Sequence, residues 1–190
     1  MAVATSAITF DVQDCKVYTI ADLVGGTYAT SASVDVPGIQ EVSVEPNFIT
    51  AELKGDGGAV LAKKGKIDRL NFSCTYSELS LPVLAKILGG SVVTGGSTTD
   101  EDAVLAIAGG SLPYFAVAFL LTDLQAPASA TADDVGSVTM ALHKCQITGG
   151  TLISGSTDDF ATPSFTAEAI LPNSKTNFGT VTFNETAATL

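Results

Sequence analysis

His143 is the only histidine in this 190-residue chain, so any chemistry that needs an imidazole must use it. A serine triad would take His143 as its general base, but the chain has no Gly-x-Ser-x-Gly motif to present a serine. His143 and Cys145 form a His-x-Cys pair, yet no second pair at zinc-ligand spacing accompanies them. We interpret His143 as a packing or surface residue of a strand, and predict no catalytic residue and no metal ligand there.

Gly65 and Lys66 stand in the order that ends a nucleotide-binding phosphate loop. That motif requires glycine where the chain has Val60, and serine or threonine where it has Ile67. The glycines at residues 55–58 are therefore interpreted as a turn, and no cofactor is predicted.

Acidic residues cluster at positions 100–102, 133–134 and 158–159, where carboxylates could bind calcium. None of the clusters has the spaced pattern of a calcium loop, so we interpret them as solvated loop tips. We expect that the protein is not an enzyme. A small enzyme whose carboxylate pair comes from distant strands stays open as an alternative.

The composition predicts a folded single domain over residues 1–190, because 46% of the residues are hydrophobic. Only 15% are charged, well below the usual quarter. Small neutral residues must therefore cover much of the surface, which is typical of proteins with large contacts between subunits.

The charge is uneven along the chain. A net charge of −11 argues against a grip on nucleic acid through its phosphates. Five of the nine basic residues nevertheless fall within residues 54–69, which hold only two acids. This window therefore carries +3, and the remaining four bases and 18 acids carry −14. A basic segment on an acidic body favours self-association; the alternative is a solvated charged loop.

Cys15, Cys74 and Cys145 are too few and too irregularly spaced for a disulfide framework. Residues 1–10 lack the features of a signal peptide, and the longest apolar run, residues 114–121, is too short to cross a bilayer. We expect no membrane anchor and a protein made in a reducing cytoplasm.

Alternation of apolar and polar residues predicts several strands. It is clearest over residues 69–77 and recurs at 41–45, 164–169 and 180–184. The apolar set shifts register between Leu142 and Cys145, which predicts a bulge or twist. Residues 114–121 are apolar on both faces and predict a central strand.

One helix is predicted at about residues 80–88, with Ser80 as its cap and Gly89 as its stop. We expect its apolar stripe to pack on the apolar face of the 69–77 strand. This packing would involve Leu70, Phe72, Cys74, Tyr76, Leu81, Leu84 and Leu88. A second, weaker helix is predicted over residues 100–108, and loops are predicted over 89–100, 125–136 and 149–163. The expected fold is mainly β, a β-sandwich or barrel with one flanking helix.

The order of these features resembles the major tail tube protein of long-tailed (siphovirus-type) bacteriophages. The resemblance lies in the extended Glu52-Leu53-Lys54-Gly55-Asp56 segment, the charged stretch 63–69, the long alternating strand and the helix ending at Gly89-Gly90. The late stretch 165–170 is also similar. About half of the chain is covered, and residues 91–136 have no counterpart.

The resemblance implies a fold related to the tube protein of type VI secretion systems. Hexameric rings would stack into a hollow virion tail tube through which DNA passes without specific binding. Assembly would occur in the host cytoplasm, and the tape measure, tail tip and terminator proteins would be partners. A long loop or arm at about residues 48–66 would reach the next ring. The inter-ring contact candidates are Lys54, Asp56, Lys63, Lys64, Lys66 and Arg69.

DNA passage would require a lumen that repels phosphate, and part of the acidic excess would face it. Asn71, Ser73 and Thr75, on the polar face of the alternating strand, are the lumen-face candidates. Another assembly protein, such as a capsid decoration protein or an adhesin or fibre subunit, is the main alternative. A carbohydrate-binding β-sandwich is disfavoured because the chain has no tryptophan.

Overall fold

The computed structural model describes residues 9–22, 27–56, 58–97, 100–107, 109–124, 136–153, 160, 162–184 and 189–190. In chain order the elements are β1 (Thr9–Ala21), β2 (Ala29–Asp35), β3 (Ile39–Lys54), β4 (Val60–Tyr76), α1 (Leu81–Leu88), β5 (Gly90–Ser97), β6 (Asp100–Ile107), β7 (Phe115–Asp123), β8 (Gly136–Gly149), β9 (Ser164–Ala169) and β10 (Gly179–Asn184).

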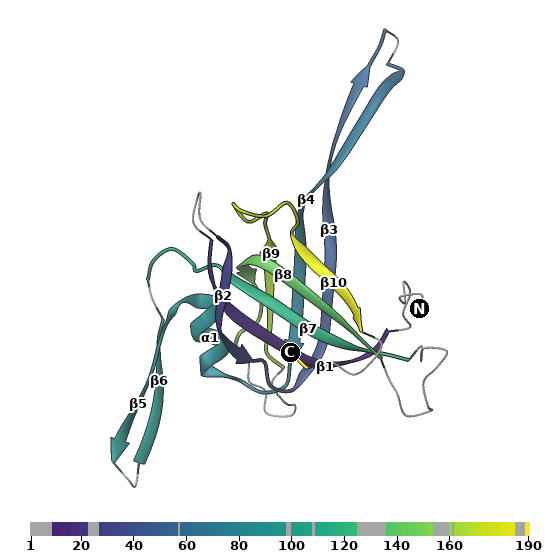
Figure 1. Cartoon of the computed structure of the whole chain (residues 1–190). Helices are drawn as coiled ribbons and strands as arrows, with labels where there is room; N and C mark the ends of the chain where they lie inside the picture. Colours follow the sequence, from purple (N-terminus) through teal and green to yellow (C-terminus); the bar gives the residue numbers. More distant parts are fainter. Residues whose placement is uncertain are drawn as a thin grey trace.

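One antiparallel sheet forms the body of the molecule (Figure 1). Its strand order is β2-β1-β7-β8-β9-β4-β3, and β10 also pairs with β8. The sheet curls so that β1 contacts β3, and its two halves enclose one apolar core. The predicted fold class, a mainly-β sandwich with one flanking helix, is confirmed.

The core joins the two halves through aromatic side chains. Phe72 of β4 stacks on Phe119 of β7, with ring centroids 6.0 Å apart, and also packs against Phe165 of β9 at 5.7 Å. The predicted alternation is visible in β9 and in the last part of β4, from Asn71 to Tyr76, where every second side chain is buried. Cys15 and Cys74 interact across this core as free thiols, and this contact together with burial raises the pKa of Cys15.

Strand β8 is central and carries the predicted irregularity. Its first half lies between β7 and β10, whereas its last residues pair with β9. The register with β7 shifts between the Leu142 and Cys145 pairs, which confirms the predicted bulge. At this bulge the β8 backbone forms a hydrogen bond outside the β7 pairing: the His143 N–H donates to the Phe178 carbonyl at 2.9 Å. β7 is the central strand predicted from its two apolar faces, and its first residue is Phe115.

The predicted helix is confirmed as α1. Gly89, at φ 78°, ends it, but the Ser80 side chain makes no capping hydrogen bond. Val83, Leu84 and Ile87 are its buried residues and belong to the same core cluster as the apolar face of β4. In space, the backbone of the helix lies close to β1, β2, β8 and the β5–β6 hairpin. It therefore closes one end of the core rather than lying along β4.

Two sequence predictions in the middle of the chain are wrong. Residues 90–97, predicted as a loop, and residues 100–107, predicted as a helix, form the two strands of one hairpin. The β-branched Val92 and Val93 pair with Leu105 and Val104, and cross-strand pairs of such residues favour strands. The predicted 125–136 loop lies outside the described residues, apart from Gly136 at the start of β8.

The predicted strand at 180–184 is present as β10, but its apolar residues are less buried than the alternation suggests. Val181 and Phe183 stand on an edge strand that pairs only with β8 and remain 53% and 36% exposed. Within the predicted 149–163 loop, residues 150–153, 160 and 162–163 form no strand or helix, and Gly149 ends β8.

A buried ion pair ties β8 to two other segments of the chain. Lys144 Nζ lies 2.7 Å from Asp22 Oδ2, and the two side chains are only 10% and 3% exposed. The Asn173 amide also donates to Asp22, at 3.0 Å. The hydrogen bond from Lys144 lowers the pKa of Asp22, while partial burial acts in the opposite direction.

We expect Asp22→Asn to lower the free energy of unfolding at pH 7 by about 2 kcal/mol, because Lys144 would stay buried without a counter-charge. Since the folded-state pKa of Asp22 is lowered, its stabilisation is complete above the ordinary value of 3.8 and is lost as the pH falls below it. Urea unfolding at pH 7 and pH 3 should therefore show a smaller difference between the two proteins at pH 3. Asp56→Asn, on an exposed turn, is the matched control. Equal differences at both pH values would contradict this role.

Candidate assembly surfaces

The lumen-face candidates Asn71, Ser73 and Thr75 lie on the side of β4 that faces away from the core, because the alternate residues of β4 are buried. Directly paired residues of antiparallel strands share a face. The side chains paired with these three across β3 and β9 are Glu41, Ser43, Glu45, Ser164, Thr166 and Glu168. We call this set of nine residues the polar sheet face.

The polar sheet face is hydroxyl-rich, acidic and slightly hollowed. Ser43 and Ser73 share a hydrogen bond of 2.8 Å between their hydroxyls. A shallow open depression of about 400 Å³ lies over its middle. The face holds three glutamates and no lysine or arginine. Glu168 is paired with Arg69, whereas Glu41 and Glu45 form no ion pair with any residue that the structure describes.

Arg69 borders the polar sheet face and forms ion pairs with residues of its own chain. Its guanidinium lies 2.8 Å from Asp68 and 2.8 Å from Glu168 of β9. The hydrogen bonds that the guanidinium donates to these carboxylates raise the pKa of Arg69. The structure therefore does not group Arg69 with the other predicted inter-ring residues.

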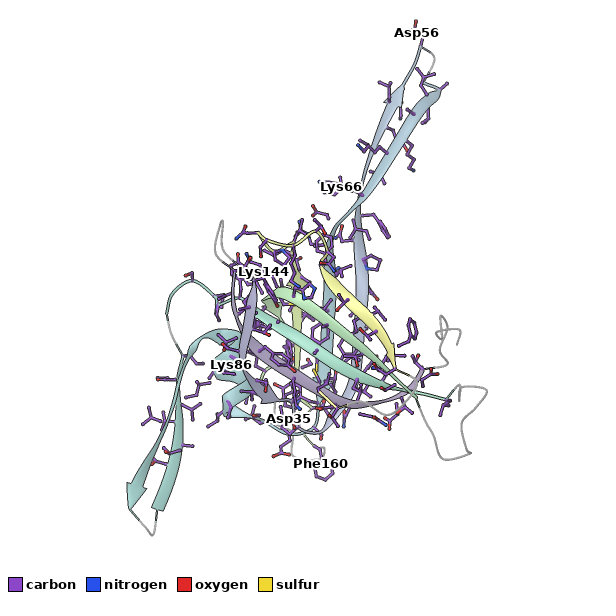
Figure 2. All side chains as sticks on the ribbon, in the orientation of Figure 1. Asp35, Asp56, Lys66, Lys86, Lys144 and Phe160 are labelled. Atoms are coloured by element: carbon purple, nitrogen blue, oxygen red, sulfur yellow. The ribbon has the colours of Figure 1, made fainter. Side chains whose placement is uncertain are left out.

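The predicted arm at residues 48–66 is a β-hairpin rather than a loop. The strands β3 and β4 stay paired from Phe48–Ile67 out to Lys54–Val60 and project beyond the body (Figure 1). Figure 2 places Asp56 at the tip of this projection and Lys66 near its base. We call residues 48–67 the basic arm. Seven strand residues give it a reach of about 20 Å.

Both faces of the basic arm are open to solvent, and every described residue except Gly55 is exposed. Its exposed large apolar side chains are Phe48, Ile49, Leu53, Val60, Leu61 and Ile67. Lys63 pairs with Glu52 across the hairpin at 3.2 Å. Lys54, Lys64 and Lys66 form no ion pair with any residue that the structure describes. The arm thus combines apolar surface with uncompensated positive charge.

A second hairpin, β5–β6, projects from the opposite end of the molecule (Figure 1). It contacts the body mainly beside α1, and Leu105 packs against the core. Val93 and Val104, one pair further out than Leu105, and Ile107, at the base of the hairpin, are each more than half exposed. Sequence reasoning missed this element because neither of its faces is buried, so no alternation marks it.

His143 and Cys145 do not share a site. Cys145 is in the core, and burial raises its pKa well above the usual range. His143 instead faces a separate pocket of about 310 Å³ and meets the Tyr28 ring edge-on, with centroids 5.4 Å apart. Burial, assisted by the charge of Lys175, lowers the pKa of His143, so the imidazole is neutral at pH 7.

No group of three or more His, Cys, Asp or Glu side chains gathers within the described ranges in a way that could hold a metal. The acids at 133–134 and 158–159 lie outside those ranges. Within the same ranges, none of the helical structure is long and apolar enough for a membrane span.

Comparison with known proteins gives a likeness in structure only. No protein-family model and no curated protein matches the chain. Among solved structures, the chain is similar to the tube-terminating cap of the anti-feeding prophage, determined by cryo-electron microscopy. The TM-score is 0.45 and the identity 15%, over 98% of this chain and 95% of that one. A likeness of this size is too low to transfer a role.

Proposed function

We propose that this protein is a non-enzymatic structural subunit of a virion tail tube. Six copies would close a ring, rings would stack into a hollow tube, and DNA would travel through it without specific binding. The observation that carries the proposal is the basic arm, a projecting hairpin with two uncovered faces. A two-stranded ribbon is marginally stable in water by itself, so a surface of this kind fits a partner.

The direction in which the basic arm projects is consistent with the stacking of rings. It leaves the body at one end only, so a contact between it and a different surface of another copy would be heterologous and would repeat along a line. Among the strands that the structure describes, β2 and β3 are edge strands of the sheet, which fits ring closure, since pairing between copies would cover them.

The polar sheet face supports the lumen part of the proposal. Glu41 and Glu45 would repel phosphate, since Glu168 is paired with Arg69, and the hydroxyls would give passing DNA no fixed contact. The apolar core on the other side of the same strands keeps this face in place. In the tube, the tape measure, tail tip and terminator proteins would be the further partners.

Negative-stain electron microscopy of the purified chain tests the proposal. We expect hexameric rings and hollow tubes at low salt. Rings should remain but stacking should decrease at about 1 M salt, where the Debye length is about 3 Å. Trimers or thin solid fibres would contradict the proposal and favour a capsid decoration protein or a fibre subunit. Particles that stay monomeric at every concentration would contradict self-assembly of the chain alone.

A further inference from the structure

We infer that the β5–β6 hairpin is the docking surface for the basic arm of a second copy of this chain. This inference rests on the proposed function, since it names the partner surface that stacking would use. We call residues 90–107 the acidic hairpin. Its two strands, of eight residues each, would span about 25 Å, close to the reach of the arm.

The acidic hairpin has apolar surface that the rest of its own chain leaves exposed. Val93 and Val104 are directly paired and lie 58% and 54% exposed on one face. Ile107 lies on the other face and is 63% exposed. Exposed β-branched pairs on a projecting ribbon favour a contact with another chain.

Charge complementarity selects the basic arm as the occupant. Asp100, Glu101 and Asp102 give the acidic hairpin three negative charges near its outer end, and it holds no lysine or arginine. The basic arm carries Lys54, Lys63, Lys64 and Lys66 against two acids. Each surface thus offers apolar side chains together with the charge that the other lacks.

The positions of the two hairpins make this contact propagate. They project from opposite ends of the body, so one molecule cannot join its own arm to its own acidic hairpin (Figures 1 and 2). In a head-to-tail stack, the basic arm of each copy points toward the end from which the acidic hairpin of its neighbour projects. A repeated contact between two different surfaces extends as a filament.

Charge reversal tests the pairing in tubes. The arm variant is Lys54→Glu, Lys64→Glu and Lys66→Glu, which spares the Lys63–Glu52 ion pair. The hairpin variant is Asp100→Lys, Glu101→Lys and Asp102→Lys. We expect each variant to reduce the tube mass that sediments by about tenfold, because like charges would then meet. The chain with both reversals should recover most of the loss, and Glu78→Lys, an exposed site on neither hairpin, should match the unmodified protein.

Chemical cross-linking tests the same contact without requiring tubes. The three natural cysteines are buried, so a short bis-maleimide reagent should react with an introduced exposed thiol. Ala51→Cys on the basic arm and Ala103→Cys on the acidic hairpin keep all charges, and the two variants carry tags of different size. We expect mixed dimers to outnumber same-tag dimers. Ala29→Cys on β2 replaces the hairpin site in the control.

Several outcomes separate the two proposals. Unmodified tubes with no effect of hairpin reversal would overturn the inference and leave the tube proposal standing. Cross-linking no more frequent with Ala103→Cys than with Ala29→Cys would also overturn the inference. Specific cross-linking without tubes would support the contact and contradict the tube. Failure of the doubly reversed chain to regain tubes, with its circular dichroism unchanged, would also count against the pairing.

Discussion

Replacing Phe72 with alanine should lower the free energy of unfolding by about 4 kcal/mol, the largest single-residue loss that we expect in this chain. Phe72 is 1% exposed and contacts Phe119 and Phe165, so its ring joins β4, β7 and β9. Removal would cost its transfer free energy and leave a cavity between two halves of one curled sheet. Those halves cannot close the cavity without moving strands that neighbouring hydrogen bonds hold in register.

Urea unfolding followed by circular dichroism measures this loss. Phe48→Ala is the matched control, because it removes the same atoms from a ring that is 62% exposed on the basic arm. We expect the control to change stability by less than about 0.5 kcal/mol. Phe72→Leu should cost less than Phe72→Ala, since it keeps most of the buried volume. Similar losses for Phe72→Ala and Phe48→Ala would show that the core does not depend on this aromatic cluster.

Shortening the basic arm should abolish stacking while leaving the body folded. Ile49 and Lys66 are directly paired, so residues 50–65 can be replaced by an Asn-Gly turn between them. The replacement deletes three of the four arm lysines and three of the six large exposed apolar residues. None of the deleted residues belongs to the core, so we expect little change in the free energy of unfolding.

Electron microscopy and sedimentation of the shortened chain measure the effect. We expect rings without tubes and at least about a tenfold loss of sedimenting mass. A full-length chain with Lys54→Gln, Lys64→Gln and Lys66→Gln separates the reach of the arm from its charge, and should lose less mass. Tubes of normal length from the shortened chain would rule out the basic arm as the contact between rings.

The elements that could be predicted best from the sequence are those with one face buried in the core and the other exposed to water. Strand β4 shows regular alternation because its inner side chains meet the core and its outer ones meet water. The helix was found because Pro82 near its start and Gly89 at its end mark its limits. The bulge in β8 appeared in the sequence as a shift of the apolar set.

Both hairpins escaped the same reasoning for one physical reason. Neither of them buries a face in the body, so polar and apolar residues follow no period of two along them. The basic arm was predicted as a loop, and the acidic hairpin as a loop and a helix. Its acids and spaced apolar residues suit a short helix as well as a strand, and only the pairing of Val93 with Val104 decides between them.

The polar sheet face could be predicted only in part. Asn71, Ser73 and Thr75 follow from the alternation of a single strand. Glu45 and Glu168, which lie on either side of Asn71, come from strands whose pairing with β4 no local pattern determines. The acidity of this face is therefore a property of the sheet order.

The sheet order also has a consequence for how the chain folds. Strand β4 pairs with β9 nearly a hundred residues later, and β1 pairs with β7 across a similar separation. Distant pairings of this kind slow folding, whereas a hairpin between adjacent strands can form within microseconds. The basic arm and the acidic hairpin can therefore form, as marginally stable ribbons, while the core is still open. During synthesis, their exposed valines, leucines and phenylalanine are present before the last strands are made. A newly made chain can thus associate through its hairpins before it closes, and the rate of core closure sets how often that occurs.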